Sequence, residues 1–130
     1  MKDSIRQGAL SGRRVLVVED RYFTATDLEA LLSAYGAEVV GPCPDVSGAL
    51  ALADRAHGAV LDVDLWGDRV FPVADVLADR GAPFVFVTGL PPDACPAPHR
   101  SAPWIEKPYD PLALVAALAA ALDAKAAEEA

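Results

Sequence analysis

The sequence predicts an α/β domain built on a doubly wound, five-stranded parallel sheet. Short apolar runs of strand length alternate along the chain with segments in which apolar residues recur at helical spacing. Parallel neighbours in a sheet need crossover connections of about a dozen or more residues, and the helical segments have this length. Gly36, Gly58 and Gly81 follow helical segments, at the place where glycine commonly ends a helix. The alternation therefore favours helices on both faces of one sheet.

The individual elements follow from the same patterns. Strands are expected where apolar runs are bounded by glycine, proline or charged residues, at 15–18, 37–40, 59–61, 84–87 and 103–106. Helices are expected where apolar residues fall at i, i+3, i+4 and i+7, at 22–35, 46–53, 70–77 and 111–122. Asp45 and Asp110 stand at the N-cap positions of the second and last of these helices.

The alternation calls for one more helix, between the fourth and fifth strands, but the residues there disfavour it. Residues 90–101 contain Pro91, Pro92, Pro96 and Pro98. A proline inside a helix costs about 3 kcal/mol, so a Pro-rich loop is expected in place of this helix. Outside these elements, residues 1–12 are expected to form a flexible N-terminal arm, 13–124 the folded domain and 125–130 a frayed C-terminal tail.

Composition describes a single globular domain and excludes several functional classes. The 130 residues are 53% apolar and 23% charged, which suits one packed core. No apolar run reaches the roughly 18 residues of a membrane span, and no apolar segment of a secretory signal follows the N-terminus. The net charge of −8 disfavours nucleic-acid binding. Cys43 and Cys95 lack metal-ligand spacing and are expected to be reduced thiols, consistent with a cytoplasmic location.

Polar side chains stand where the predicted strands end. Glu19 and Asp20 follow the first strand, Asp62 the third, Thr88 the fourth and Lys107 the fifth. In a flavodoxin-like sheet with strand order 2-1-3-4-5, these carboxyl ends lie side by side, at the edge where α/β proteins bind ligands. Each residue alone has an ordinary structural explanation, as a helix cap, a strand-end hydroxyl or a solvated charge. Their coincidence at one edge favours a functional site.

The residue types at this edge suit phosphoryl transfer. Three clustered carboxylates are unfavourable unless a cation or a proton compensates them, and oxygen ligands of this kind suit Mg²⁺. One carboxylate could attack a phosphoryl donor to give an acyl phosphate. Thr88 offers a hydroxyl donor and Lys107 a positive charge to the incoming phosphoryl oxygens.

Four motifs of this chain resemble the signature of the response-regulator receiver domain, the CheY-like phospho-accepting partner of histidine kinases. They are Val-Val-Glu-Asp at 17–20, Leu-Asp-Val-Asp-Leu at 61–65, Val-Thr-Gly at 87–89 and Lys-Pro at 107–108. The resemblance covers residues 14–123, with the motifs in the family's order and spacing.

The resemblance implies a role for each residue of the site. Asp62 matches the phosphorylated aspartate, Asp20 a direct Mg²⁺ ligand and Glu19 its companion acid, usually reached through water. Asp62 and the main-chain carbonyl of Asp64 would complete the protein ligands of the metal. Thr88 and Lys107 match the phosphoryl-binding pair.

The resemblance also implies features around the site. The family's Lys-Pro peptide is typically cis, so a cis bond is expected between Lys107 and Pro108. Trp104 stands where the family keeps an aromatic switch residue, usually Tyr or Phe, and Trp66 replaces a proline common after the phosphorylation site. Phe-Val-Thr-Gly at 86–89 resembles the receiver subgroup called FAT GUY, many of which are single-domain proteins.

The function implied is that of a stand-alone bacterial receiver. It would accept a phosphoryl group on Asp62 from a sensor histidine kinase or a phosphotransfer protein, and act by protein–protein contact or as a phosphate sink. It would not be an enzyme beyond self-phosphorylation from small donors and autodephosphorylation. With the fourth helix degraded, a homodimer would use a non-standard face.

Three alternatives remain open. A haloacid-dehalogenase-like phosphatase would use Asp62 and Asp64 as nucleophile and general acid, but it needs an acidic pair after Lys107 and has no need of Glu19 and Asp20. A pseudo-receiver would bind a partner without being phosphorylated, although the complete acidic set argues against it. A flavin-binding protein of this fold would need a phosphate-binding loop after the first strand, which the sequence lacks.

Overall fold

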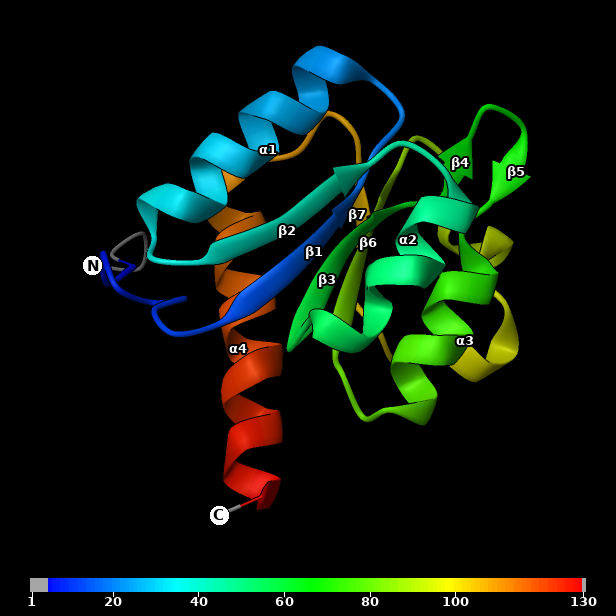
Figure 1. Ribbon diagram of the computed structural model, residues 1–130. Coiled ribbons are helices and arrows are strands. Elements are labelled where there is room, and N and C mark those ends of the chain that lie inside the picture. The colour runs from blue at the N-terminus through cyan, green and yellow to red at the C-terminus, as the bar shows by residue number, and fades with distance from the viewer. Residues whose placement is uncertain (1–4, 130) are drawn as a thin grey trace.

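The computed structural model describes residues 5–129 and contains the predicted parallel sheet (Figure 1). Its strand order is β2-β1-β3-β6-β7, which is 2-1-3-4-5 when the strands of this sheet are counted along the chain, as expected. The strands are β1 (Arg14–Val18), β2 (Glu38–Cys43), β3 (Gly58–Asp62), β6 (Phe84–Thr88) and β7 (Trp104–Glu106).

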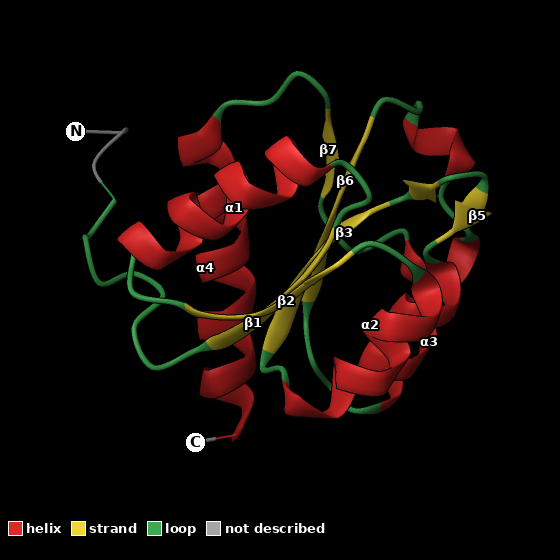
Figure 2. Ribbon diagram, turned by 45° about the horizontal axis from the view of Figure 1, so that its top comes forward, coloured by secondary structure: helices red, strands yellow, loops and turns green. Residues whose placement is uncertain are grey.

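Helices cover both faces of this sheet. They are α1 (Tyr22–Ala34), α2 (Val46–Leu52), α3 (Phe71–Asp79) and α4 (Pro111–Glu129), with a short 3₁₀ turn at Ala53–Arg55 after α2. Figure 2 shows the sheet nearly edge-on, with α1 and α4 on one side and α2 and α3 on the other. The predicted fold class is therefore confirmed.

Alternating side chains of the strands supply two separate cores. Val15, Val17 and Val60 pack with α1 and α4, whereas Leu16 and Leu61 point to the other face and pack with α2 and α3. All five residues of β3 and of β6 are buried, because these central strands are covered on both faces. This explains why they read in the sequence as continuous apolar runs.

The register of the strands brings their carboxyl ends to one edge. Val18 of β1 pairs with Leu61 of β3, and Asp62 pairs with Val87 of β6. Thr88, the last residue of β6, pairs with Glu106 of β7. The residues that follow these pairs in the sequence therefore lie next to one another along one edge of the sheet.

A short hairpin between β3 and α3 was not expected from the sequence, which indicated only a loop at 66–68. Asp64–Leu65 (β4) and Asp68–Arg69 (β5) pair antiparallel around Trp66 and Gly67. Tryptophan is not a usual residue for such a turn, so local sequence gave no signal for the hairpin.

Near both ends of the described residues, the chain forms contacts and helical structure that the sequence patterns did not indicate. Residues 1–4 and 130 lie outside the described residues. Within the expected flexible arm, Ala9 and Leu10 are buried, and the Leu10 N–H donates to the Tyr35 carbonyl at 2.9 Å. The last helix continues to Glu129, beyond residue 122 where its apolar pattern ends, because its alanine-rich sequence has high helix propensity. The domain boundaries, the flexibility of the N-terminal arm and the fraying of the C-terminal tail remain predictions.

The Pro-rich segment 90–102 forms no α-helix, as expected. It contains two single 3₁₀ turns, Pro92–Ala94 (η2) and Ala97–His99 (η3), each preceded by a proline in extended conformation. The buried His99 fastens the segment to α3, since its Nε2 lies 2.7 Å from Asp75 Oδ1. Within residues 5–129, no helix is both long and apolar enough to cross a membrane.

Candidate functional site

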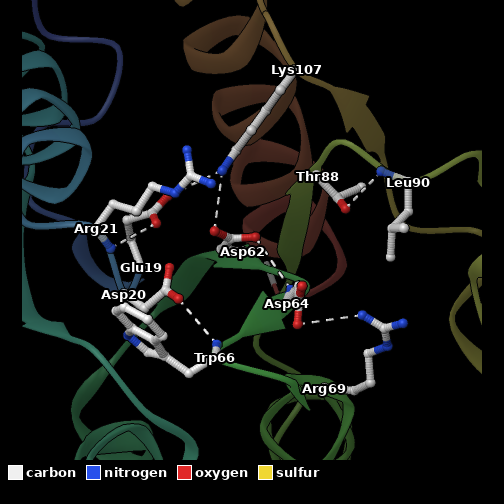
Figure 3. Close-up of polar contacts among 10 residues, drawn as sticks. All are labelled: Glu19, Asp20, Arg21, Asp62, Asp64, Trp66, Arg69, Thr88, Leu90 and Lys107. Carbon is white, nitrogen blue, oxygen red and sulfur yellow. Dashed lines mark hydrogen bonds and ion pairs between the residues drawn. The ribbon is translucent and has the colours of Figure 1, made fainter.

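Three carboxyl side chains meet at the carboxyl edge of the sheet (Figure 3). Glu19 and Asp20 follow β1, and Asp62 ends β3. One carboxylate oxygen from each lies within 4.8 Å of the others. Glu19 and Asp62 are buried, whereas Asp20 is half-buried and faces the opening. The register of β1 against β3 thus forms the acidic cluster that the sequence predicts.

Lys107 is the cation of this cluster. Its Nζ lies 3.1 Å from Asp62 Oδ2 and 3.4 Å from Glu19 Oε1. The Lys107 N–H donates to the Thr88 carbonyl at 2.8 Å, which fixes the residue to the end of β6. The peptide bond between Lys107 and Pro108 is cis, as the resemblance led us to expect.

The electrostatics of the cluster are not balanced by Lys107 alone. The pKa of Glu19 is raised to about 7, chiefly by burial, and the neighbouring Asp62 charge contributes to this rise. The Arg21 N–H, which donates to Glu19 Oε2 at 3.0 Å, and the Lys107 ammonium act in the opposite direction. An added cation would stabilise the charged form of a buried carboxyl group like this one.

Thr88 and Trp104 are connected through one residue that the sequence did not single out. The buried Thr88 Oγ1 accepts a hydrogen bond from the Leu90 N–H at 3.1 Å. The Trp104 indole N–H donates to the Leu90 carbonyl at 3.0 Å, and its ring packs on Phe86 with centroids 5.3 Å apart. Leu90 was missed because its contribution comes from its main chain, which carries no side-chain signal.

A cleft of about 440 Å³ opens over these groups. Lys107 and Thr88 line it together with Asp20 and Asp62. The Asp62 carboxylate, the Lys107 ammonium and the Thr88 hydroxyl therefore face one space, which is large enough for a phosphoryl group and a hydrated cation.

Comparison with known proteins identifies the family. No protein-family model and no curated protein matches the chain, but solved structures do. SdrG from Sphingomonas melonis Fr1 is 36% identical; the match covers 88% of this chain and 97% of SdrG, with a TM-score of 0.66. The response regulator PhyR from Brucella abortus is 25% identical over 95% of this chain, with a TM-score of 0.79. The chain belongs to the response-regulator receiver family.

A receiver protein from Sinorhizobium medicae WSM419 shares the fold. It is 21% identical over 87% of this chain and 96% of its own, with a TM-score of 0.74. The match to Brucella abortus PhyR covers 53% of PhyR, so this receiver spans about half the length of that protein.

In this receiver, the side chain of Asp64 stands apart from the acidic cluster. Its N–H donates to Asp62 Oδ1 at 3.3 Å, but its own carboxylate accepts the Gly67 N–H at 3.1 Å and pairs with Arg69 at 3.5 Å. A role as metal ligand through its main-chain carbonyl stays a prediction. A role as general acid beside Asp62 is disfavoured, since the carboxylate is engaged with Arg69.

Trp66 is a second residue of the site whose contact the sequence did not reveal. Its N–H donates to Asp20 Oδ2 at 3.0 Å, while 82% of the residue is exposed. The contact joins the β4–β5 hairpin to the end of β1, across 46 positions of sequence. No local pattern could predict it, because it depends on how the hairpin folds back over the receiver site.

Proposed function

We propose that this receiver accepts a phosphoryl group on Asp62 from a phosphohistidine of a histidine kinase or a phosphotransfer protein. The observation that supports this best is the position of Asp62. It is a buried carboxylate, held 3.1 Å from the Lys107 ammonium, at a cleft that a phosphoryl donor could enter. The family's general role in bacterial phosphorelays and a cytoplasmic location belong to the same proposal.

The reaction is a phosphoryl transfer between two side chains. A carboxylate oxygen of Asp62 attacks phosphorus, a P–O bond forms, and the P–N bond to the donor imidazole breaks, with the electron pair leaving on nitrogen. Lys107 stays near the new phosphoryl group and offsets its negative charge. The product is an acyl phosphate, which water then hydrolyses to restore the carboxylate.

The donor set fits Mg²⁺. Three carboxylates with oxygens within 4.8 Å of one another suit a hard cation that prefers oxygen ligands and keeps several waters. Glu19, Asp20, Asp62 and the main-chain carbonyl of Asp64 would hold it. When bound, the cation would neutralise charge on the phosphoryl oxygens during transfer.

The contacts of Thr88 support a route from the phosphoryl group to the surface. In this structure the Thr88 hydroxyl accepts a hydrogen bond from the Leu90 N–H. If the Thr88 side chain rotated so that its hydroxyl donated to a phosphoryl oxygen, Oγ1 would move away from that N–H and release it. Leu90 is also bonded to Trp104, so the change would reach the Pro-rich segment 90–102. We propose that Trp104 serves as the aromatic switch residue, and that the hydrogen bond to Leu90 links it to the site. The sequence at 86–89 supports membership of the FAT GUY subgroup, which remains part of the proposal.

Beryllofluoride, which mimics an aspartyl phosphate, tests the assignment directly. Added with Mg²⁺, it should give a saturable change in the fluorescence of Trp66 and Trp104 in the wild-type protein. Asp62→Asn should abolish the change, and Asp54→Asn, which alters an exposed carboxylate of the 3₁₀ turn after α2, should leave it intact.

Three results would contradict the proposal. Saturable binding that persists in Asp62→Asn would place the acceptor elsewhere. No binding by the wild-type protein, with amide spectra unchanged, would indicate a pseudo-receiver. Many turnovers on a phosphomonoester in a steady-state assay would instead favour the phosphatase alternative.

A further inference from the structure

The β4–β5 hairpin has an unusual residue at its turn. Its two-residue loop places both Trp66 and Gly67 in the left-handed region, with φ of 54° and 91°. Turns of this kind prefer Asn, Asp or Gly at the first loop position, because other residues adopt positive φ only with strain. Within residues 5–129, Trp66 is the one residue other than glycine with a positive φ. Such an outlier near a functional site needs a compensating contact.

That contact is made by the main chain of Trp66. Its N–H donates to Asp20 Oδ2 at 3.0 Å, in the cleft over the acidic cluster (Figure 3). A hydrogen bond to an ionised carboxylate is stronger than one between neutral groups. The indole is exposed and takes no part in the core, so position 66 acts on the site through its backbone.

The Asp20 carboxylate makes different polar contacts from the other two carboxylates of the cluster. Lys107 contacts Glu19 and Asp62, and Arg21 donates to Glu19. Within the described part of the chain, the Trp66 N–H is the one hydrogen-bond or ion-pair partner of the Asp20 carboxylate. Without it, repulsion from two neighbouring carboxyl groups would favour rotation of Asp20 toward solvent, away from the position in which the three carboxylates converge.

We propose that Trp66 is a positioning residue for the cation site: its main-chain N–H, presented by the left-handed turn, holds Asp20 in the orientation that a divalent cation needs. The proposal rests on the proposed function, because the cation is the one that receiver chemistry would use. Groups that orient metal ligands typically change metal affinity by about 10- to 100-fold when they are lost.

Three substitutions of Trp66 separate the N–H from the indole. Trp66→Gly and Trp66→Asn keep the N–H and tolerate positive φ, so both should bind Mg²⁺ within about 2-fold of wild type. Trp66→Pro has no N–H and a fixed negative φ, so its Mg²⁺ dissociation constant should rise by about 10-fold or more. Calorimetric titration with Mg²⁺ alone measures the affinity without any phosphoryl transfer. Equal affinity in all three variants, or a loss in all three, would overturn the proposal.

A second measurement needs no metal and does not depend on the fold of the proline variant. In the metal-free wild-type protein, the Trp66 N–H should exchange slowly with solvent, although the loop is exposed. Asp20→Ala should speed this exchange by about 10-fold or more, while Asp20→Asn, which keeps an acceptor oxygen, should retain most of the protection. The Gly67 N–H is the internal control, since its partner is Asp64 within the hairpin.

The two measurements distinguish failure of this proposal from failure of the proposed function. If wild-type protein takes up no Mg²⁺ while Trp66 exchange still depends on Asp20, the proposed chemistry is wrong and the positioning contact stands. If Mg²⁺ binds but Trp66 exchange is the same in Asp20→Ala, the receiver chemistry stands and the positioning role is wrong.

Discussion

At the scale of single residues, the site concentrates like charges that ordinary folding would separate. Glu19 and Asp62 are both buried, and Lys107 is the cation that contacts them. Removing one partner of a buried charged contact costs more than the contact itself contributes, because the remaining charge is left without compensation. Lys107 should therefore affect the stability of the fold as well as the proposed phosphoryl transfer, and the two effects can be measured separately.

Lys107→Ala should lower the free energy of unfolding of the metal-free protein by about 1–3 kcal/mol above neutral pH. In an Asp62→Asn background the loss should be smaller, since the neutral amide needs less compensation. Urea unfolding of the four proteins of this cycle gives the coupling between the two residues.

Lys125→Ala is the matched control for the lysine substitution. Lys125 pairs with Glu128 at 4.0 Å and Glu129 at 3.8 Å on the surface of α4, and such pairs contribute little. Its loss should change stability by less than about 0.5 kcal/mol. Equal losses for Lys107→Ala with and without Asp62→Asn would show that the lysine does not stabilise Asp62.

At the scale of elements, the Pro-rich segment 90–102 replaces a helix yet stays attached to the domain. Its prolines remove the N–H groups that a helix would use, and side chains take over the attachment. His99 Nε2 meets Asp75 Oδ1 of α3 at 2.7 Å, and the His99 ring packs edge-on against Phe84 and Phe86 at centroid distances of 5.5 and 6.2 Å. One polar pair and one buried ring thus substitute for a helical face.

Asp75→Ala should lower the free energy of unfolding by about 1–2 kcal/mol, because the buried His99 loses its partner. His99→Ala should cost more, since it also removes a packed ring, and the double variant should cost less than the sum. Hydrogen exchange should speed up across 90–102 in both single variants. Asp79→Ala, an exposed change one helical turn later, should leave both measurements nearly unaltered; additive costs for His99 and Asp75 would refute the coupling.

The elements also show how far the sequence predicts this structure. The sheet strands follow from periodicity and the position of the polar residues follows from strand ends, which are local signals. The strand order, and with it the convergence of Asp20, Asp62, Thr88 and Lys107, follows only once a flavodoxin-like sheet is assumed, as the resemblance to receivers implies. The β4–β5 hairpin, the His99–Asp75 pair and the burial of Leu10 do not, because each depends on tertiary contacts that override local preference. A lone histidine in a Pro-rich stretch looks the same in sequence whether it is buried or exposed.

At the scale of the whole molecule, one of the two buried cysteines lies in the central sheet and the other in the Pro-rich segment outside it. Cys43 ends β2, where it is paired with Val18 of the central strand β1, and its carbonyl accepts the Glu19 N–H at 2.9 Å. Cys95 lies between the two 3₁₀ turns of segment 90–102. Burial raises the pKa of both thiols, so neither should react with a thiol reagent until its surroundings open.

The rates at which a thiol reagent modifies the two cysteines should therefore measure different opening reactions of the protein. Each rate is measured in a variant that keeps only one cysteine. In Cys43→Ser, the remaining Cys95 should be modified through local opening of 90–102, with a rate that depends weakly on urea. In Cys95→Ser, the remaining Cys43 should need global unfolding, with a rate about 10-fold or more slower in water and a steep urea dependence. The two variants should first be shown to share one urea midpoint.

The same rates measured with beryllofluoride and Mg²⁺ test whether the proposed phosphorylation changes segment 90–102. If the phosphoryl mimic draws Thr88 away from Leu90, the change reaches segment 90–102. Ligand binding stabilises the folded state and so slows every modification that needs global unfolding. The rate at which Cys95 is modified should change by more than this general slowing. The Cys43 rate should show that global slowing alone. Identical urea slopes for the two thiols would mean that 90–102 opens only with the whole domain, and that a signal reaching it must alter the entire fold.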